Sequence, residues 1–98
     1  MIVRIVKLTL GAGNINGFFE AFESVKDQIR NFEGCVRMEL LTDVEDSGIV
    51  FTYSVWNTAH DLERYRQSAL FQSTWKAVKP MFSAKAEAWT LNKQVDKL

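Results

Sequence analysis

The chain has 98 residues, the length of one small domain, and 47% of them are hydrophobic, enough for a packed core. Its 12 basic and 12 acidic residues cancel without forming a basic stripe, which argues against a nucleic-acid partner. No apolar run approaches the roughly 20 residues that a membrane-spanning helix needs, so we expect one domain over residues 1–98 and no membrane association.

The first predicted element is a strand over residues 2–10, where β-branched and other apolar residues surround Arg4 and Lys7. Alternation along a strand places four side chains on one face: Ile2, Arg4, Val6 and Leu8. The segment lacks the apolar core and cleavage site of a signal peptide. The single cysteine, Cys35, cannot form a disulfide within the chain. Both observations indicate a cytoplasmic protein.

A helix is predicted from residue 16 to residue 33, because apolar side chains recur there at spacings of four and three. This stripe consists of Phe18, Phe22, Val25, Ile29 and Phe32. Asn14 or Asn16 can cap the start of the helix, and Gly34 fits just past its end.

Two strands separated by a turn follow the helix. Residues 35–44 alternate, with Val36, Met38 and Leu40 on one face and Cys35, Arg37 and Glu39 on the other. Residues 45–48 read EDSG, which is typical of a turn, and residues 49–56 are again rich in β-branched and aromatic residues. We expect an antiparallel hairpin, in which the facing of Lys7, Arg37 and Glu39 is not determined by the pattern.

The C-terminal third predicts two short helices and a last strand. Thr58 with Asp61 resembles a capping box, and Ser68 can cap the next helix, which ends near Pro80. Residues 83–91 read as a strand, and a polar tail begins at about residue 91.

The order β-α-β-β-α-α-β is typical of the ferredoxin-like α+β fold, with helices on one face of a four-stranded antiparallel sheet. Both faces of the third strand carry apolar groups, so the face away from the helices requires a cover. We therefore expect a homodimer that packs sheet to sheet.

Residues 53–71 read YSVWNTAHDLERYRQSALF, and this run resembles the antibiotic biosynthesis monooxygenase family. The resemblance extends over residues 1–91 and includes VKLTL in the first strand and FEG before the second. It implies a dimeric α/β barrel. Family members of known activity oxidise polycyclic phenols or quinols with O2 and no prosthetic group, whereas others degrade haem.

The polar groups of both known kinds of site are replaced in this sequence. In haem-degrading relatives an Asn, a Trp and an iron-binding His occupy the positions of Val6, Tyr65 and Trp75. The one histidine, His60, lies only four residues past Trp56, so haem degradation by that route is disfavoured. In quinone-forming relatives an Asn and a Tyr occupy the positions of Thr52 and Leu62, and only the Trp is retained, as Trp56.

The candidate catalytic residues are Arg4, Trp56 and Tyr65, and the candidate substrate-binding residues are Thr52, Ser54 and Trp75. Aromatic rings suit a flat aromatic ligand, and a cation can stabilise a phenolate and lower its pKa.

Each candidate also has a plain structural interpretation. Trp56 and Trp75 fit packing positions in a core, Tyr65 fits either role, and Arg4 can reach solvent from a strand end. Thr52 and Ser54 are compatible with ordinary hydrogen bonding within a strand. His60 is typical of a solvated helix residue and Cys35 of a small core residue.

Three functions are compatible with this pattern. The first is a small monooxygenase that oxidises a phenol or quinol with O2 and without a metal or an organic cofactor. The second is a non-catalytic homodimer that binds a hydrophobic metabolite or haem. The third is a scaffold with a filled core whose function lies in assembly. One His and one Cys are too few for a zinc site within the chain.

Overall fold

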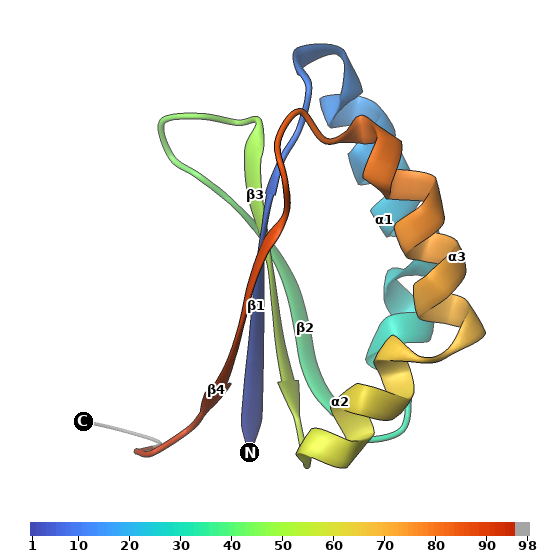
Figure 1. Ribbon diagram of the computed structural model, residues 1–98, viewed down its shortest axis with the longest axis vertical. Coiled ribbons are helices and arrows are strands. Elements are labelled where there is room, and N and C mark those ends of the chain that lie inside the picture. The colour runs from blue at the N-terminus through green and yellow to red at the C-terminus, as the bar shows by residue number, and fades with distance from the viewer. Residues whose placement is uncertain (96–98) are drawn as a thin grey trace.

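The computed structural model describes residues 1–95 and contains one four-stranded antiparallel sheet with its helices on one face (Figure 1). The strands are β1 (Ile2–Thr9), β2 (Cys35–Thr42), β3 (Ile49–Trp56) and β4 (Glu87–Asn92), and the helices are α1 (Ile15–Arg30), α2 (Ala59–Arg66) and α3 (Ala69–Val78). Short 3-10 turns occupy Ala12–Asn14 and Lys79–Met81. The sheet order β2-β3-β1-β4 confirms the predicted ferredoxin-like arrangement. No helix in this part of the chain is long and apolar enough to cross a membrane.

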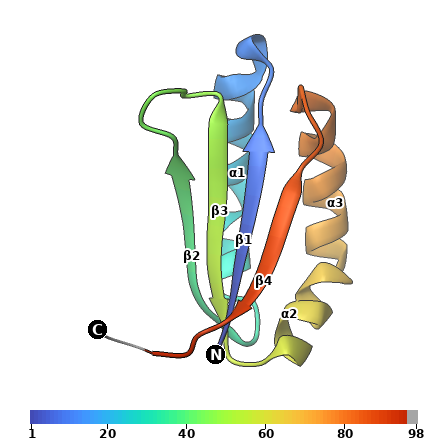
Figure 2. The ribbon, with the colours of Figure 1, turned by 60° about the vertical axis from the view of Figure 1, so that its left-hand side comes forward.

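The molecule has two layers, with α1 and α3 side by side over the sheet and α2 across one end of it (Figure 1). The opposite face of the sheet carries no helix, as the turned view shows (Figure 2). Alternation along β3 directs four side chains toward the helices, namely Val50, Thr52, Ser54 and Trp56. Val50 belongs to the core on that side, Thr52 and Ser54 line a cavity there, and Trp56 is fully buried.

Two separate hydrophobic clusters join the layers. One consists of Leu8, Leu10, Phe18, Val50 and Val78, and lies between the sheet and the paired helices. The other consists of Ile29, Met38, Trp56, Leu62 and Tyr65, and lies under α2 and the end of α1. The predicted apolar stripe of α1 supplies both clusters, because Phe18 lies near the start of the helix and Ile29 near its end.

The helix caps are partly as predicted. The Thr58 hydroxyl accepts a hydrogen bond from the Asp61 backbone N–H (3.1 Å), and the Ser68 hydroxyl accepts one from the Phe71 N–H (3.1 Å). Asn14 occupies the position before α1 but its side chain donates to the Met81 carbonyl instead, and Asn16 lies inside the helix. The Asn caps were therefore wrong, because Asn14 links the start of α1 to the end of the second 3-10 turn.

Two segments differ from the predicted boundaries of α1 and β2. Helix α1 ends at Arg30, so Gly34 belongs to the following loop. A β-bulge between Cys35 and Arg37 inserts one residue into β2 and leaves Val36 exposed. Cys35 consequently pairs with Trp56 on the helix-covered face, opposite to its predicted facing.

The last strand also begins later than predicted. Regular pairing with β1 starts at Glu87 rather than at residue 83. Before Glu87 the segment makes an isolated bridge, between Phe82 and Leu10. β4 extends to Asn92, so the predicted tail begins after the strand, and residues 96–98 of that tail lie outside the described part of the chain.

Gly34 provides a test of how the loop before β2 packs on α2. Its φ of +86° is a left-handed conformation, and a Cβ there would overlap the Asp61 side chain. Gly34→Ala should therefore lower the free energy of unfolding by more than about 1 kcal/mol, measured by urea denaturation. Gly13→Ala is the matched control, since nothing lies within 4 Å of a Cβ at that position. Equal stability of the two variants would contradict this account of the loop.

Candidate functional site

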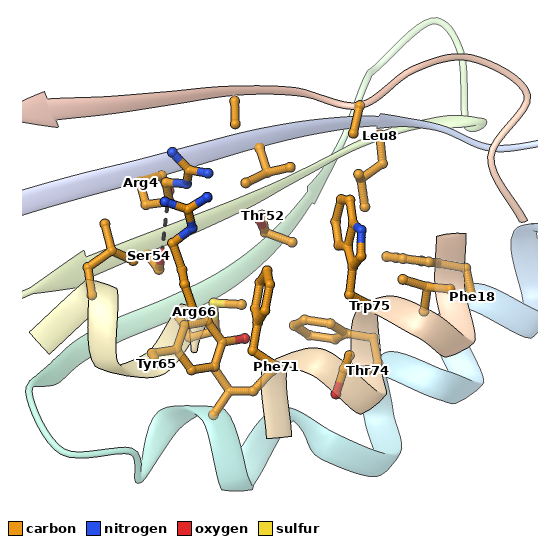
Figure 3. Close-up of a pocket in the computed structure, with 18 residues that line it drawn as sticks. Arg4, Leu8, Phe18, Thr52, Ser54, Tyr65, Arg66, Phe71, Thr74 and Trp75 are labelled. Atoms are coloured by element: carbon orange, nitrogen blue, oxygen red, sulfur yellow. Dashed lines mark hydrogen bonds between the residues drawn. The ribbon is translucent and has the colours of Figure 1, made fainter. Parts of the chain in front are cut away.

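A cavity of about 330 Å³ lies between the two hydrophobic clusters, beneath the helices (Figure 3). Members of both clusters line it, including Leu8, Phe18 and Val78 from one and Ile29, Leu62 and Tyr65 from the other. The volume is at the lower end of the range of small-molecule sites, roughly 300–1,000 Å³. The cavity argues against the third alternative, a scaffold whose core is filled with side chains.

Part of the cavity's sheet side consists of small side chains opposite the aromatic rings of the helices, beside larger ones such as Val6 and Met38. Its sheet side includes Thr52, Ser54, Ala86 and Ala88, none of which reaches far from the strand. The clusters at the two ends set the distance between helices and sheet, so short side chains midway between them leave the space unfilled.

Aromatic rings in continuous contact form the helix side of the cavity. Tyr65 meets Phe71 edge to face with ring centroids 5.3 Å apart, and Phe71 stacks on Trp75 at 5.9 Å with an interplanar angle of 11°. Trp75 in turn contacts Phe82 edge to face at 5.4 Å. Each ring is fixed by its neighbours, so the wall is a pre-formed surface for a flat ligand.

Trp56 lies behind this wall and does not line the cavity. Its side chain is fully buried, and its ring stacks on Tyr65 with centroids 4.9 Å apart. The Trp56 Nε1–H donates to the Ser54 hydroxyl (3.0 Å), and that hydroxyl donates to the Arg4 carbonyl (3.4 Å). The structure thus brings Tyr65 and Trp75 to the cavity, as predicted, and places Trp56 in the core.

Burial keeps the Tyr65 phenol protonated. Desolvation, with a smaller contribution from Cys35, raises the pKa of Tyr65 to about 12. At neutral pH the hydroxyl is therefore a hydrogen-bond donor and cannot serve as a general base. Tyr65 can therefore donate a hydrogen bond to an anion that develops in the cavity.

Arg4 and Arg66 both line the cavity, from β1 and from the end of α2 (Figure 3). Arg4 donates to the Thr90 hydroxyl on the paired strand β4 (2.7 Å), whereas Arg66 lies 3.5 Å from a Glu63 carboxylate oxygen. Partial burial, followed by the Arg66 charge, lowers the pKa of Arg4. Arg4 thus faces the ligand space, and within residues 1–95 it forms no ion pair.

The remaining candidates lie elsewhere. His60 is exposed on the first turn of α2 and does not contribute to the cavity. Cys35 is half-buried beside Trp56, and burial raises the pKa of its thiol. Nowhere in residues 1–95 do three His, Cys, Asp or Glu side chains gather in a way that could hold a metal ion.

Sequence reasoning missed Arg66, Phe71 and Thr74 as cavity residues. Arg66 had a usable signal, because it follows Leu62 by four residues and therefore shares its helix face. Phe71 likewise precedes Trp75 by four residues. No pattern identified Thr74, whose buried hydroxyl finds no hydrogen-bond partner among the described residues.

A partly open cavity beneath the helices of a ferredoxin-like α+β domain is thus the candidate small-molecule site, and the fold defines the class of small α+β domain to which the chain belongs. Within that class, the family model described as antibiotic biosynthesis monooxygenase matches residues 1–77. The chain therefore belongs to this family, as its sequence indicated. No curated protein matches the chain.

Solved structures agree closely in fold. A Nitrosomonas europaea protein that carries an antibiotic biosynthesis monooxygenase assignment superposes with a TM-score of 0.91 at 18% identity, covering 97% of this chain and 100% of that one. A conserved protein from Methanosarcina mazei gives 0.90 at 17% identity, with coverages of 96% and 94%. A Bordetella bronchiseptica protein with the same family assignment gives 0.83 at 21% identity, with coverages of 96% and 97%. At these identities the similarity establishes the fold and not the reaction.

The raised pKa of Tyr65 can be measured directly. The chain has two tyrosines, so the absorbance change on ionisation that Tyr65→Phe removes from an alkaline titration belongs to Tyr65. We expect that change to occur near pH 12 in the folded protein. Because the folded-state pKa exceeds the ordinary value of 10.0, the stability that this burial contributes is present below pH 10 and is lost as pH rises through 12. A lost component with its midpoint near pH 10 would show that the hydroxyl is solvated.

Proposed function

We propose that the protein is a cofactor-independent monooxygenase that oxidises a small aromatic phenol or quinol with O2. The observation that supports this most strongly is the cavity, which combines an aromatic wall with the Tyr65 phenol and the guanidinium groups of Arg4 and Arg66. Family membership supports oxygen chemistry of this kind. We place the reaction in the cytoplasm, in accord with the free Cys35.

The reaction needs no external reductant. A phenol whose para carbon carries hydrogen loses its proton to give a phenolate, which transfers an electron to O2. Recombination forms a C–O bond at the para carbon, and the O–O bond then breaks. One oxygen atom remains as the quinone carbonyl and the other leaves as water, so the phenol supplies all four electrons that reduce O2. A quinol, whose para carbon already carries oxygen, would react at a ring carbon that bears hydrogen ortho to the phenolate oxygen and give a hydroxyquinone and water.

The protein would favour this sequence by orientation and electrostatics. Trp75 and Phe71 stack on the substrate ring, with Thr52 and Ser54 beneath it. The Tyr65 hydroxyl donates to the developing phenolate, and the Arg4 charge across the cavity lowers the pKa of the phenol, whose proton passes to water. Trp56 contributes indirectly, because its stacking and its hydrogen bond to Ser54 position Tyr65.

Oxygen uptake with a panel of anthrones, naphthols and quinols tests this proposal. We expect uptake matched by quinone formation without release of hydrogen peroxide. Arg4→Gln should lower kcat/KM at least about tenfold because it removes a positive charge that stabilises the bound anion, and Tyr65→Phe about tenfold because it removes the donor to the phenolate. Lys76→Gln, an exposed change on α3, is the control. The proposal fails if no substrate consumes oxygen, and the site assignment fails if both variants match the wild type.

The second candidate is a protein that binds a hydrophobic metabolite without transforming it. It is favoured by the absence of any Asp, Glu or His among the described cavity-lining residues, which leaves no evident base. Saturable binding of the same aromatic panel without oxygen uptake would support it. Haem fits less well, because His60 is outside the cavity; a Soret band on haem titration that is lost in Tyr65→Ala would reverse this conclusion.

We also propose that the active form is a homodimer joined through the uncovered face of the sheet. Three large apolar side chains remain about half exposed there, namely Leu41 (47%), Trp89 (44%) and Leu91 (46%). Pairing aligns Trp89 with Ile5 and Tyr53 across the sheet, in a continuous apolar row. The residues of β4 are exposed along its whole length, and a partner sheet would cover the apolar side chains on this face of the strand.

The charged residues on this face do not oppose such packing. Lys7 lies 3.7 Å from Glu87 across the paired strands, and Arg37 donates to Glu39 (2.9 Å) on the same strand. Two cations and two carboxylates thus cancel within one sheet. The registers of β1 and β2 place all four on the uncovered face, which answers what the sequence pattern left open.

Light scattering tests the dimer. The wild-type protein should have twice the 11.3 kDa mass of one chain. Trp89→Glu should convert the protein to a monomer, because dimerisation would bury the new, unpaired carboxylate. Ala77→Glu is the control, since Ala77 is exposed on α3, on the opposite side of the sheet from this face. A single wild-type species of 11.3 kDa would refute the proposed interface.

A further inference from the structure

We infer that the ligand of the cavity carries a fixed carboxylate, held between Arg4 and Arg66 at the mouth. This rests on the proposed function, because it presumes that the cavity binds a flat aromatic molecule. It adds a recognition element that neither the family match nor the aromatic wall supplies.

The two guanidinium groups come together from different elements. Arg4 reaches the mouth from β1 and Arg66 from the last turn of α2, and the close-up shows their guanidinium groups side by side at one end of the cavity (Figure 3). The influence of the Arg66 charge on Arg4 agrees with that proximity. Trp75 lies toward the other end, so an aromatic ring against Trp75 would direct its substituent toward the two arginines.

The charges at the mouth are not balanced by the protein. Arg4 has a neutral hydroxyl, that of Thr90, as its side-chain partner within residues 1–95. Arg66 has Glu63 at 3.5 Å, and that carboxylate also accepts a closer hydrogen bond from Gln67 (2.9 Å). No Asp or Glu among the described residues lines the cavity. One exposed carboxylate therefore faces two guanidinium groups, and like charges beside an apolar cavity are costly unless an anion joins them.

A carboxylate is the anion that best fits this arrangement. The planar guanidinium fork matches two carboxylate oxygens, and charge-assisted hydrogen bonds of this kind are short and strong. The small cavity leaves room for few rings besides. The expected ligand is thus an aromatic carboxylic acid whose reacting phenol lies deeper, beside Tyr65.

Isothermal titration with two isosteric probes tests the inference: 6-hydroxy-2-naphthoate and its neutral amide, 6-hydroxy-2-naphthamide. At pH 7 and low salt the wild type should bind the carboxylate at least about tenfold more tightly than the amide, as expected for charge-assisted hydrogen bonds. Arg4→Gln and Arg66→Gln should each remove most of this preference while leaving affinity for the amide nearly unchanged.

Two further variants sharpen the result. Lys76→Gln removes an equal charge from the exposed surface of α3 and should leave the preference intact. Glu63→Gln removes the carboxylate that competes for Arg66, so it should raise the preference about two- to threefold. Circular dichroism confirms that each variant is folded.

The outcomes separate this inference from the function on which it rests. Equal wild-type affinity for the two probes, or a preference unchanged in both arginine variants, overturns the carboxylate site while leaving an aromatic-binding cavity. Tighter binding of 2-naphthyl phosphate than of the naphthoate overturns the assignment to a carboxylate. Failure of every probe to bind overturns the inference together with the proposed function.

Discussion

The hydrogen bond between the Trp56 indole and the Ser54 hydroxyl is the contact on which the rest of the site depends. A fully buried indole N–H needs a partner, and Ser54, two residues earlier on the same strand face, provides it at 3.0 Å. The bond orients the Trp56 ring so that Tyr65 stacks on it. Tyr65 then positions Phe71, and Phe71 positions Trp75, so one polar contact in the sheet sets the geometry of an aromatic wall that extends along two helices.

An unfilled space beside this wall lowers the packing energy of a protein that binds no ligand. Apolar side chains around an unfilled space forfeit contacts that a well-packed core would gain, and single-domain proteins leave few such spaces. Here the space lies between two complete hydrophobic clusters, each of which packs normally. The fold is thus stabilised by clusters on both sides of the space, which is compatible with the proposed binding site.

The elements were predictable because local periodicity determines them, and the site was predictable only in part. The stripe from Phe18 to Ile29 and the caps at Thr58 and Ser68 have local causes. The bulge at Val36, by contrast, reversed the facing of Cys35, and no local pattern marks an inserted residue. Trp56 and Tyr65 have similar sequence signals, yet one lies behind the other, because depth within a wall depends on packing between elements.

The two faces of the sheet use charge in opposite ways, and this distinguishes a surface for protein contact from a site for a small ligand. On the uncovered face Lys7 is paired with Glu87 across β1 and β4, and Arg37 with Glu39 along β2. Covering such pairs with an apolar partner still costs desolvation of each ion, but the opposite charge within 3.7 Å offsets part of that cost. On the helix-covered face Arg4 and Arg66 share a single exposed carboxylate, so the deficit is local and lies at the end of an apolar cavity. A second copy of the same neutral face would do nothing to balance it. In the proposed carboxylate site the ligand supplies this charge, which links the electrostatics of the cavity mouth to the chemistry of the ligand.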